Sequence, residues 1–583
     1  MPENLFPGEK TKNDTSAPSI GWTIFLILFC AFVLFSNLGR AALFEPDEGR
    51  NAEVGREILL LKDWVTPHYD FIPRLDKPIS FFWLVALSYK FFGISEWSAR
   101  LPSALAALGC LSLAYGFARS LFGPWAGLWS PLILVTSVEF FGLSHVVILD
   151  MTLTFFMTLA LCCFFLGQLA VDRGRKRALF LLMYPAMGAA TLVKGPIGFL
   201  LPAMVIFFYL LLSRRWTVIR EMEIALGIPL FLLTMAPWYA LAELRNPGYL
   251  HHFLSEENVA RFATTQFKRT GPWYYFIGVL AGGFFPWTVF LPTLIAGLWK
   301  RSLKDEHLLL ILWIALPLLF FSLSSSKLPH YILPIYPPLA IIVGGLVAKA
   351  LADSTEKRSW VPWFPAVTFI LLSFVLTLVA LWPDFLPYRF QAYIHGIFPR
   401  PPISVMVGLA LTPVLALLAI SKRQWAKQEF LYPATAFGFA LFVLFAVPVI
   451  TKVSLTRSSK HLAEKAAPLM RDEDQLVLYG GYPSSLPFYL NIQRPIWVVW
   501  SGRKSKVLGS DYVAEKQPEP AAGYGRILFT TEEFTDLWKT SKHRLLVFVD
   551  REAVSRLAGL GGSSPRTLLQ IGDISLVTRS EQS

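Results

Sequence analysis

Long hydrophobic runs constrain this chain more than any other feature of its sequence. Apolar segments of about 17 to 25 residues follow one another from Gly21 to about Ile450, and each is long enough to cross roughly 30 Å of hydrocarbon. Hydrophobic residues make up 54% of the chain and charged residues 16%, with a mean hydropathy of +0.50. This balance excludes a soluble globular protein. The sequence predicts a mainly α-helical, polytopic membrane bundle.

We predict about thirteen transmembrane helices. The first, over residues 20–39, is not followed by a convincing small-residue cleavage site, so we interpret it as an uncleaved span. The others are predicted over residues 101–119, 124–143, 151–171, 179–193, 197–212, 223–241, 274–299, 308–323, 332–351, 361–382, 403–420 and 432–450.

Lysine and arginine predict the orientation, because short cytoplasmic loops collect these residues. The basic loops are residues 173–177, 214–220, 300–304, 349–358 and 422–427, with two predicted spans between successive loops. All of them should therefore share the cytoplasmic side with Lys10 and Lys12. The segment 79–92 would break this parity if it spanned, so we interpret it as a helix in the outer interface.

Three parts follow from this topology. Residues 1–18 form a cytoplasmic tail, 19–450 the transmembrane domain with a first outer loop over 40–100, and 451–583 a small α/β domain on the outer side. In the last part we predict helices over 461–467 and 531–540 and strands over 475–479, 496–500, 526–530, 545–549 and 568–577. It has no nucleotide-binding loop or catalytic elbow in its sequence, so we expect it to cover a site or admit an acceptor.

The first outer loop contains an acidic turn, residues 44–50, with Asp47, Glu48 and Arg50. An ionised carboxylate at a bilayer face is costly unless cations or water accompany it, which indicates a working site. Pro46 suits the first position of a helix, so Asp47 should lie in the first turn, where the helix dipole favours the ionised form. Arg50, one turn on, could pair with Asp47.

Other unusual ionisable residues fall on the same predicted outer side. A lone lysine near the end of a span usually extends to the headgroups. A whole set on one face instead indicates a site, and the set comprises Asp47, Lys77, Asp150, Lys194, Arg261, Lys327, His330 and Tyr331.

Such a set suits transfer from a lipid-linked donor, since the extracytoplasmic face has no supply of nucleotide-activated sugars. Cations such as Lys77 and Arg261 would hold a phosphate and stabilise the charge that it gains on leaving. A carboxylate near the anomeric carbon would orient or deprotonate the acceptor.

Several motifs together resemble the GT-C superfamily of integral membrane glycosyltransferases. Within it, the sequence is most similar to the aminoarabinose transferases that modify lipid A, relatives of the protein O-mannosyltransferases. The resemblance covers nearly all of residues 20–450 and is carried by residues 44–50, 56–64, 77–78, 83, 92–93, 100–103, 194–196, 327–331, 334 and 336–338.

The resemblance implies transfer of a sugar, such as 4-amino-4-deoxy-L-arabinose or a related sugar, from undecaprenyl phosphate to lipid A or another periplasmic acceptor in the bacterial inner membrane. Asp47 matches the family's catalytic carboxylate and Asp150 its second aspartate. Lys77 and Arg261 match phosphate contacts, and Tyr331 a tyrosine near the same group. Supporting roles would fall to Glu48, Arg50, Lys194, Lys327 and His330. Pro78 is followed by Ile79 where the family more usually has a second proline.

Alternatives remain open from the sequence. A protein O-mannosyltransferase-like enzyme would use a polyprenyl phosphate sugar on a hydroxyl acceptor. A transporter or flippase would place ionisable groups near the bilayer midplane, often with repeat symmetry, and we see neither pattern.

Cofactors and other partners are weakly indicated. No cofactor is predicted, although a divalent cation could join Asp76 and His395, which lack the tight spacing of a metal site. The net charge of +13 suits anionic lipid headgroups, and nothing suggests nucleic acid binding. The four cysteines, all within apolar runs, predict no disulfide framework.

Overall fold

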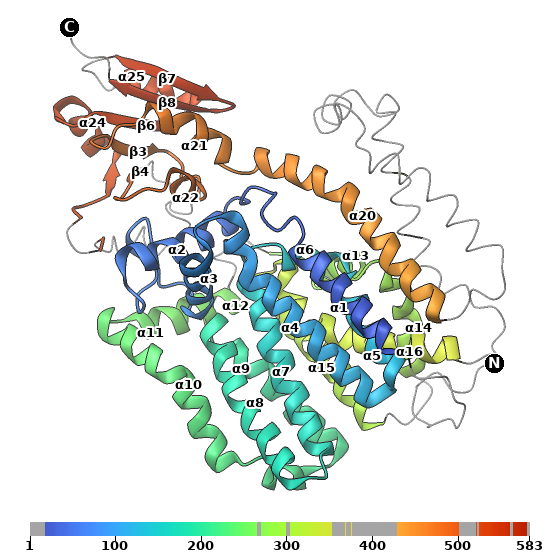
Figure 1. Cartoon of the computed structure of the whole chain (residues 1–583). Coiled ribbons are helices and arrows are strands. Elements are labelled where there is room, and N and C mark those ends of the chain that lie inside the picture. The colour runs from blue at the N-terminus through green and yellow to red at the C-terminus, as the bar shows by residue number, and fades with distance from the viewer. Residues whose placement is uncertain are drawn as a thin grey trace. The chain divides into compact units, whose positions relative to one another are not determined.

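The computed structural model describes residues 18–264, 270–298, 304–352, 428–500, 520–521, 524–559 and 564–579, with the single positions 368 and 375. These residues are mainly helical (Figure 1). The chain divides into two compact units. The helical unit comprises Met1–Leu38, Arg100–Ala240 and Leu254–Lys452, and the mixed unit comprises Gly39–Ala99, Leu241–Phe253 and Val453–Ser583.

The helical unit is built from long apolar helices and short connectors. Its described elements are α1 (Ile20–Phe35), α4 (Glu96–Phe122), α5 (Pro124–Val135), α6 (Val138–Ser144), α7 (Leu149–Leu169), α8 (Arg173–Lys194), α9 (Ile197–Ser213), η1 (Trp216–Arg220), α10 (Ile224–Arg245), η2 (His252–Ala260), α12 (Arg261–Ala263), α13 (Tyr275–Gly283), η3 (Trp287–Phe290), α14 (Leu291–Leu298), α15 (Asp305–Leu323), η4 (Pro329–Ile335), α16 (Tyr336–Ala352) and α20 (Gln428–Thr456).

Six helical segments in the described residues are long and apolar enough to cross a membrane, or up to eight if each of two bent pairs is one span. They lie in α4, α7, α10, α15, η4 with α16, and α20. The chain is therefore a multi-span membrane protein. Apart from the single positions 368 and 375, the predicted spans over 361–382 and 403–420 lie outside the described residues, so the total of about thirteen stays a prediction.

Two of the predicted spans are not continuous helices. The predicted span 124–143 bends by 69° between α5 and α6, and 274–299 bends by 115° after α13. At the first break, the hydroxyls of Thr136 and Ser137 bond back to the carbonyls of Leu132 and Ile133, at 2.6 and 2.7 Å. At the second, Pro286 disfavours a helical conformation for the residue before it.

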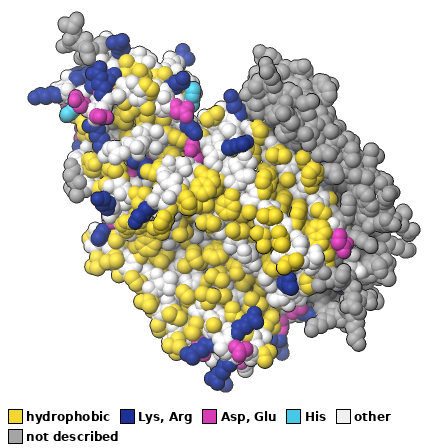
Figure 2. All heavy atoms as spheres, in the orientation of Figure 1, with side chains coloured by type: hydrophobic (Ala, Val, Ile, Leu, Met, Phe, Trp, Pro, Cys, Tyr) yellow, Lys and Arg dark blue, Asp and Glu magenta, His cyan; other side chains and the backbone are white. Residues whose placement is uncertain are grey.

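The first turns of α8 lie beside the residues that follow η1. Lys176 forms an ion pair with Glu221 at 2.7 Å, and Arg177 lies 3.5 Å from Glu223. Figure 2 shows basic and acidic side chains gathered at the lower end of the helices, below a broad face of hydrophobic side chains. The predicted basic loop 173–177 is therefore the start of a helix, and it lies beside the residues just after the predicted loop 214–220.

The mixed unit combines the first loop with the C-terminal sequence. Its described elements are α2 (Asp47–Leu61), β1 (His68–Tyr69), β2 (Ile72–Pro73), α3 (Ser80–Phe92), α11 (Tyr249–His251), α21 (Lys460–Ala466), η8 (Ala467–Leu469), β3 (Gln475–Tyr479), α22 (Leu486–Leu490), β4 (Trp497–Trp500), β5 (Leu528–Thr530), α24 (Thr531–Thr540), β6 (Leu545–Asp550), η10 (Arg551–Ala553), α25 (Val554–Ala558), β7 (Pro565–Ile571) and β8 (Ile574–Arg579). Helix α3 covers the segment predicted to lie in the interface and has 13 residues.

A six-stranded sheet of order β5-β4-β3-β6-β8-β7 forms the centre of the C-terminal part. Strands β5, β4, β3 and β6 are parallel, whereas β8 pairs antiparallel with both β6 and β7. The predicted α/β pattern is confirmed in outline, with one correction. The single strand predicted over 568–577 is wrong, because Gly572, at a φ of 55°, and Asp573 turn the chain into a β7–β8 hairpin.

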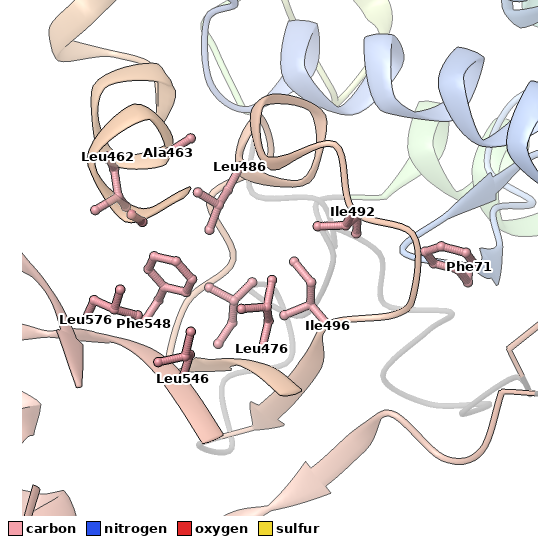
Figure 3. Packing of buried hydrophobic residues seen from close by; sticks show 12 residues of the cluster. Phe71, Leu462, Ala463, Leu476, Leu486, Ile492, Ile496, Leu546, Phe548 and Leu576 are labelled. Atoms are coloured by element: carbon pink, nitrogen blue, oxygen red, sulfur yellow. The ribbon is translucent and has the colours of Figure 1, made fainter. Parts of the chain in front are cut away.

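The first loop contributes a residue to the hydrophobic core under this sheet. Phe71 is fully buried in a cluster with residues of the C-terminal part, among them Ile492 and Ile496 (Figure 3). Asp70 and Phe71 form the two-residue turn between β1 and β2, with φ values of 54° and 61°. A phenylalanine rarely adopts this backbone conformation, so its burial compensates the strain.

Candidate active site

Helix α2 exposes one of the three carboxylates around its start. The helix begins at Asp47, as predicted for the first turn. The Asp47 side chain is 56% exposed and lies 3.3 Å from the guanidinium of Arg50, which is 10% exposed. Glu48 is buried and accepts the backbone N–H of Phe44 at 2.9 Å. Asp47 is therefore accessible to a substrate, whereas Glu48 caps the turn.

Lys77 ends a short cationic segment of the mixed unit. Arg74 forms an ion pair with Asp76 at 2.7 Å, and its guanidinium lies 5.4 Å from the centre of the Phe82 ring. The Lys77 ammonium donates to the carbonyl of Asp76 at 2.8 Å. Burial would raise the pKa of Asp76, but Arg74 and Lys77 outweigh it and hold the pKa well below its usual value. Asp76 is thus an ionised group that orders two cations.

The described residues contain no cluster of side chains that could ligate a metal ion. No group of three or more His, Cys, Asp or Glu residues there could hold a metal ion. The carboxylate of Asp76 is engaged by Arg74, and His395, its predicted companion, lies outside the described residues.

The helical unit brings four of the predicted site residues together. Asp150 lies in the first turn of α7, and Lys194 is the last residue of α8. The Lys194 ammonium donates to the Asp150 carboxylate, and it lies 4.6 Å from the centre of the Tyr331 ring. The His330 Nε2 atom is 3.8 Å from Asp150 Oδ2. We call Asp150, Lys194, His330 and Tyr331 the Asp150 cluster.

The fold explains why these residues meet. Helices α7 and α8 are antiparallel neighbours (Figure 1), so the start of one lies beside the end of the other. A carboxylate is favoured at a helix start and an ammonium at a helix end. Helix η4, which begins at Pro329, carries His330 and Tyr331 and packs against α7.

Arg261 and Lys327 lie on segments joined to each other. Arg261 follows a π-helical stretch, η2, and forms an ion pair with Glu257 at 2.6 Å. The carbonyl of its neighbour Phe262 accepts the N–H of Ser325 at 2.9 Å. Lys327 is buried and donates to the carbonyl of Ser324 at 2.5 Å. π-Helical turns are frequent at functional sites.

The predicted site residues thus form two sets. Asp47, Glu48, Arg50 and Lys77 belong to the mixed unit, and Asp150, Lys194, Arg261, Lys327, His330 and Tyr331 belong to the helical unit. That both sets surround one substrate stays a prediction.

Sequence reasoning missed two further groups. Glu139, at the break between α5 and α6, accepts from the hydroxyl of Tyr336. Glu45 accepts four hydrogen bonds from C-terminal residues. A glutamate inside an apolar run was a readable signal for the first. The second lies in the acidic turn, residues 44–50, but no sequence pattern indicates its C-terminal partners.

Two kinds of known protein resemble this chain. The family described as dolichyl-phosphate-mannose-protein mannosyltransferase matches residues 76–240. The undecaprenyl phosphate-alpha-4-amino-4-deoxy-L-arabinose arabinosyl transferase of Pseudomonas paraeruginosa is 34% identical over 58% of this chain and 62% of its own length. This alignment spans less than two thirds of that relative. The enzyme of the same description from Aeromonas hydrophila is 30% identical over 62% of this chain and 67% of its own length.

A solved structure matches nearly the whole chain. ArnT from Cupriavidus metallidurans, bound to undecaprenyl phosphate, superposes with a TM-score of 0.81 and 26% identity over 97% of this chain and 99% of its own. Its apo structure gives a TM-score of 0.79 over 96% and 98%. The chain therefore belongs to the GT-C glycosyltransferases, in a family related to the lipid A aminoarabinose transferases.

Proposed function

We propose that the protein transfers a sugar, 4-amino-4-deoxy-L-arabinose or a related one, from undecaprenyl phosphate to lipid A. The reaction would take place at the periplasmic face of the bacterial inner membrane, where the C-terminal part would also lie. The observation that carries the proposal is the match over 97% of this chain to an ArnT structure bound to undecaprenyl phosphate.

The residues of the chain suit the two halves of this reaction. An acceptor oxygen attacks the anomeric carbon of the sugar, and the bond from that carbon to the phosphate oxygen breaks with its electron pair. The polyprenyl phosphate thus leaves with one more negative charge. Lys77 and Arg261 would stabilise this charge, with Tyr331 beside the same phosphate.

Asp47 would act on the acceptor side. Its carboxylate is exposed. Glu45, two residues earlier, accepts the N–H of Ser485 and so fixes the chain before Asp47. A lipid A phosphate is largely ionised at neutral pH, so Asp47 would orient this acceptor; with a hydroxyl acceptor it would remove the proton. Asp150 is held by Lys194 and His330 and would serve as the second carboxylate of the site.

The test is Asp47→Asn in purified protein with a polyprenyl phosphate sugar and lipid A. We expect turnover to fall by about 100-fold or more while binding of undecaprenyl phosphate is unchanged within about threefold, since the phosphate contacts remain. Movement of the donor lipid without sugar transfer would contradict the proposal and indicate a transporter. Transfer to a peptide hydroxyl but not to lipid A would indicate the mannosyltransferase-like alternative.

A further inference from the structure

The segment that leads into Asp47 is held by C-terminal residues of the same mixed unit. The backbone N–H of Ala42 donates to the Ser454 hydroxyl at 2.8 Å, and that of Leu43 to the Tyr489 hydroxyl at 2.7 Å. The N–H of Glu45 donates to the carbonyl of Arg457 at 2.8 Å. Three N–H groups of residues 42–45 are thus bound by the C-terminal part.

The side chain of Glu45 makes the densest of these contacts. One carboxylate oxygen accepts the N–H of Ser485 at 2.7 Å, its hydroxyl at 2.5 Å and the hydroxyl of Ser459 at 3.0 Å. The other accepts the N–H of Ser484 at 2.6 Å. Hydrogen bonds to a charged acceptor are among the strongest in proteins, and four on one carboxylate fix its position closely.

The first turn of α2 also fits tightly against this same point. A Cβ atom on Gly49 would lie 2.6 Å from the backbone nitrogen and Cα of Ser485. The hydroxyl of Ser485 in turn accepts the N–H of Ser459 at 3.0 Å. The helix start can therefore approach Ser485 only because residue 49 has no side chain.

We propose that Glu45 is a positioning residue, which fixes the turn that carries Asp47 by docking its carboxylate on Ser459, Ser484 and Ser485. The C-terminal part is then a structural component of the active site and not only a cover over it. This inference rests on the proposed function, because it assumes that Asp47 acts on the acceptor. A misplacement of about 1 Å at a reacting group can lower a rate about 100-fold.

Another carboxylate of the mixed unit provides a matched control. Glu96 joins the same two parts of the chain, since it accepts from the Lys460 ammonium at 2.7 Å and the Tyr489 hydroxyl at 3.2 Å. In the described part of the chain, Glu96 reaches residues 42–45 only through the Tyr489 hydroxyl, and the amide oxygen of Glu96→Gln can still accept from this hydroxyl, so the Leu43 contact is kept. If the contacts serve only to attach the C-terminal part, loss of either carboxylate should have the same effect.

The experiment measures transfer and donor binding for Glu45→Gln, Ser485→Ala, Glu96→Gln and the unchanged protein. The amide of Glu45→Gln has only one acceptor oxygen; if that oxygen keeps the three bonds of Oε1, its NH₂ faces the N–H of Ser484, which then has no acceptor there. We expect Glu45→Gln to lower kcat about 10- to 100-fold and Ser485→Ala about tenfold, with the dissociation constant for undecaprenyl phosphate unchanged within about threefold. Glu96→Gln should lower kcat by less than about threefold.

Epistasis with Asp47 separates positioning from general loss of structure. In an Asp47→Asn background there is no carboxylate left to position, so adding Glu45→Gln should lower the residual rate by less than about twofold. A role in folding alone would reduce the rate by the same factor in both backgrounds, and that result would overturn the inference. Equal effects of Glu45→Gln and Glu96→Gln would also overturn it.

The positioning role of Glu45 and the transferase activity can fail separately, and the two results differ. If the unchanged protein transfers sugar and loses that activity with Asp47→Asn, but Glu45→Gln matches the unchanged protein, the positioning role is wrong and the transferase stands. If the unchanged protein transfers no sugar from any polyprenyl phosphate donor, the proposed function fails and takes the inference with it.

Discussion

Three carboxylates within four residues of the first loop meet three different environments. Glu45 is bound by four donors from the C-terminal part, Glu48 caps its own turn, and Asp47 is exposed beside Arg50. The helix start and the Arg50 pairing could be predicted, because both depend on residues within one turn. The Glu45 contacts could not, since Ser485 lies 440 residues further along the chain.

The contacts within the Asp150 cluster could be predicted only in part. Sequence reasoning singled out Asp150, Lys194, His330 and Tyr331 as unusual positions on one predicted face. It could not pair them, because pairing depends on the packing of α7, α8 and η4. Asp150 is 4% exposed and Lys194 12%, so neither charge has much water as an alternative partner.

We expect Lys194→Met to destabilise the protein by about 3 to 5 kcal/mol, since it leaves a buried carboxylate without its main cation. Thermal unfolding in detergent would measure the effect. The double variant Asp150→Asn with Lys194→Met should recover part of the loss. An additive loss in the double variant would show that the two groups do not depend on each other.

At the scale of elements, local sequence patterns predicted the secondary structure of short segments. The strand over 475–479 and the helix over 531–540 match β3 and α24, both of which carry their own signals. Thr530 and Glu533, for instance, form a capping box at the start of α24. The β7–β8 hairpin was missed although Gly572-Asp573 is a turn signal. The bends after α5 and α13 were missed because the hydropathy of a segment does not indicate whether its helix axis stays straight.

The contact of α2 with Ser485 leads to an element-scale prediction. Gly49→Ala would force the start of α2 away from the Ser485 backbone, so we expect a lower melting temperature and lower turnover. Gly481→Ala is the control, because a Cβ atom there would meet nothing within 4 Å. Equal melting temperatures for the two variants would mean that the helix start tolerates displacement.

The turn between β1 and β2 should make stability depend on pH. Glu57 accepts the N–H groups of Asp70 and Phe71 at 2.7 and 3.0 Å. Burial, reinforced by the nearby charge of Glu53, raises the pKa of Glu57 well above its usual value. Burial also raises the pKa of Asp70.

A raised pKa favours the protonated form in the folded state, so this stabilisation is present in acid and is lost as the pH rises through the raised pKa. We expect the melting temperature to fall as the pH rises above the ordinary pKa range of a carboxylate, and Glu57→Gln to flatten the slope. Asp76, with a lowered pKa, acts in the opposite sense and loses its contribution only in stronger acid. An unchanged slope in Glu57→Gln would assign the pH dependence to other groups.

At the scale of the whole molecule, composition alone predicted a polytopic helical protein, and the motifs predicted its family. The make-up of the mixed unit was beyond reach, because its three stretches are widely separated in the sequence. Only their shared core and hydrogen bonds reveal that residues 39–99 and 453–583 fold together (Figure 3).

Orientation in the membrane is testable with cysteine labelling. The native cysteines are free and buried, so background labelling by a membrane-impermeant maleimide should be low. We expect Asp573→Cys to be labelled from the periplasm and Arg175→Cys only after the inner membrane is broken, since both positions are exposed. Labelling of Arg175→Cys from the periplasm would reverse the proposed topology.

The union of the first loop with the end of the chain has a consequence for biosynthesis. Glu45 accepts the N–H of Ser485, which the ribosome adds 440 residues later. The acidic turn is therefore fixed only long after its own residues have been made. A nascent chain that stops before Ser485 would insert its helices without a fixed acidic turn, so any function of this turn would have to wait for the residues that bind Glu45.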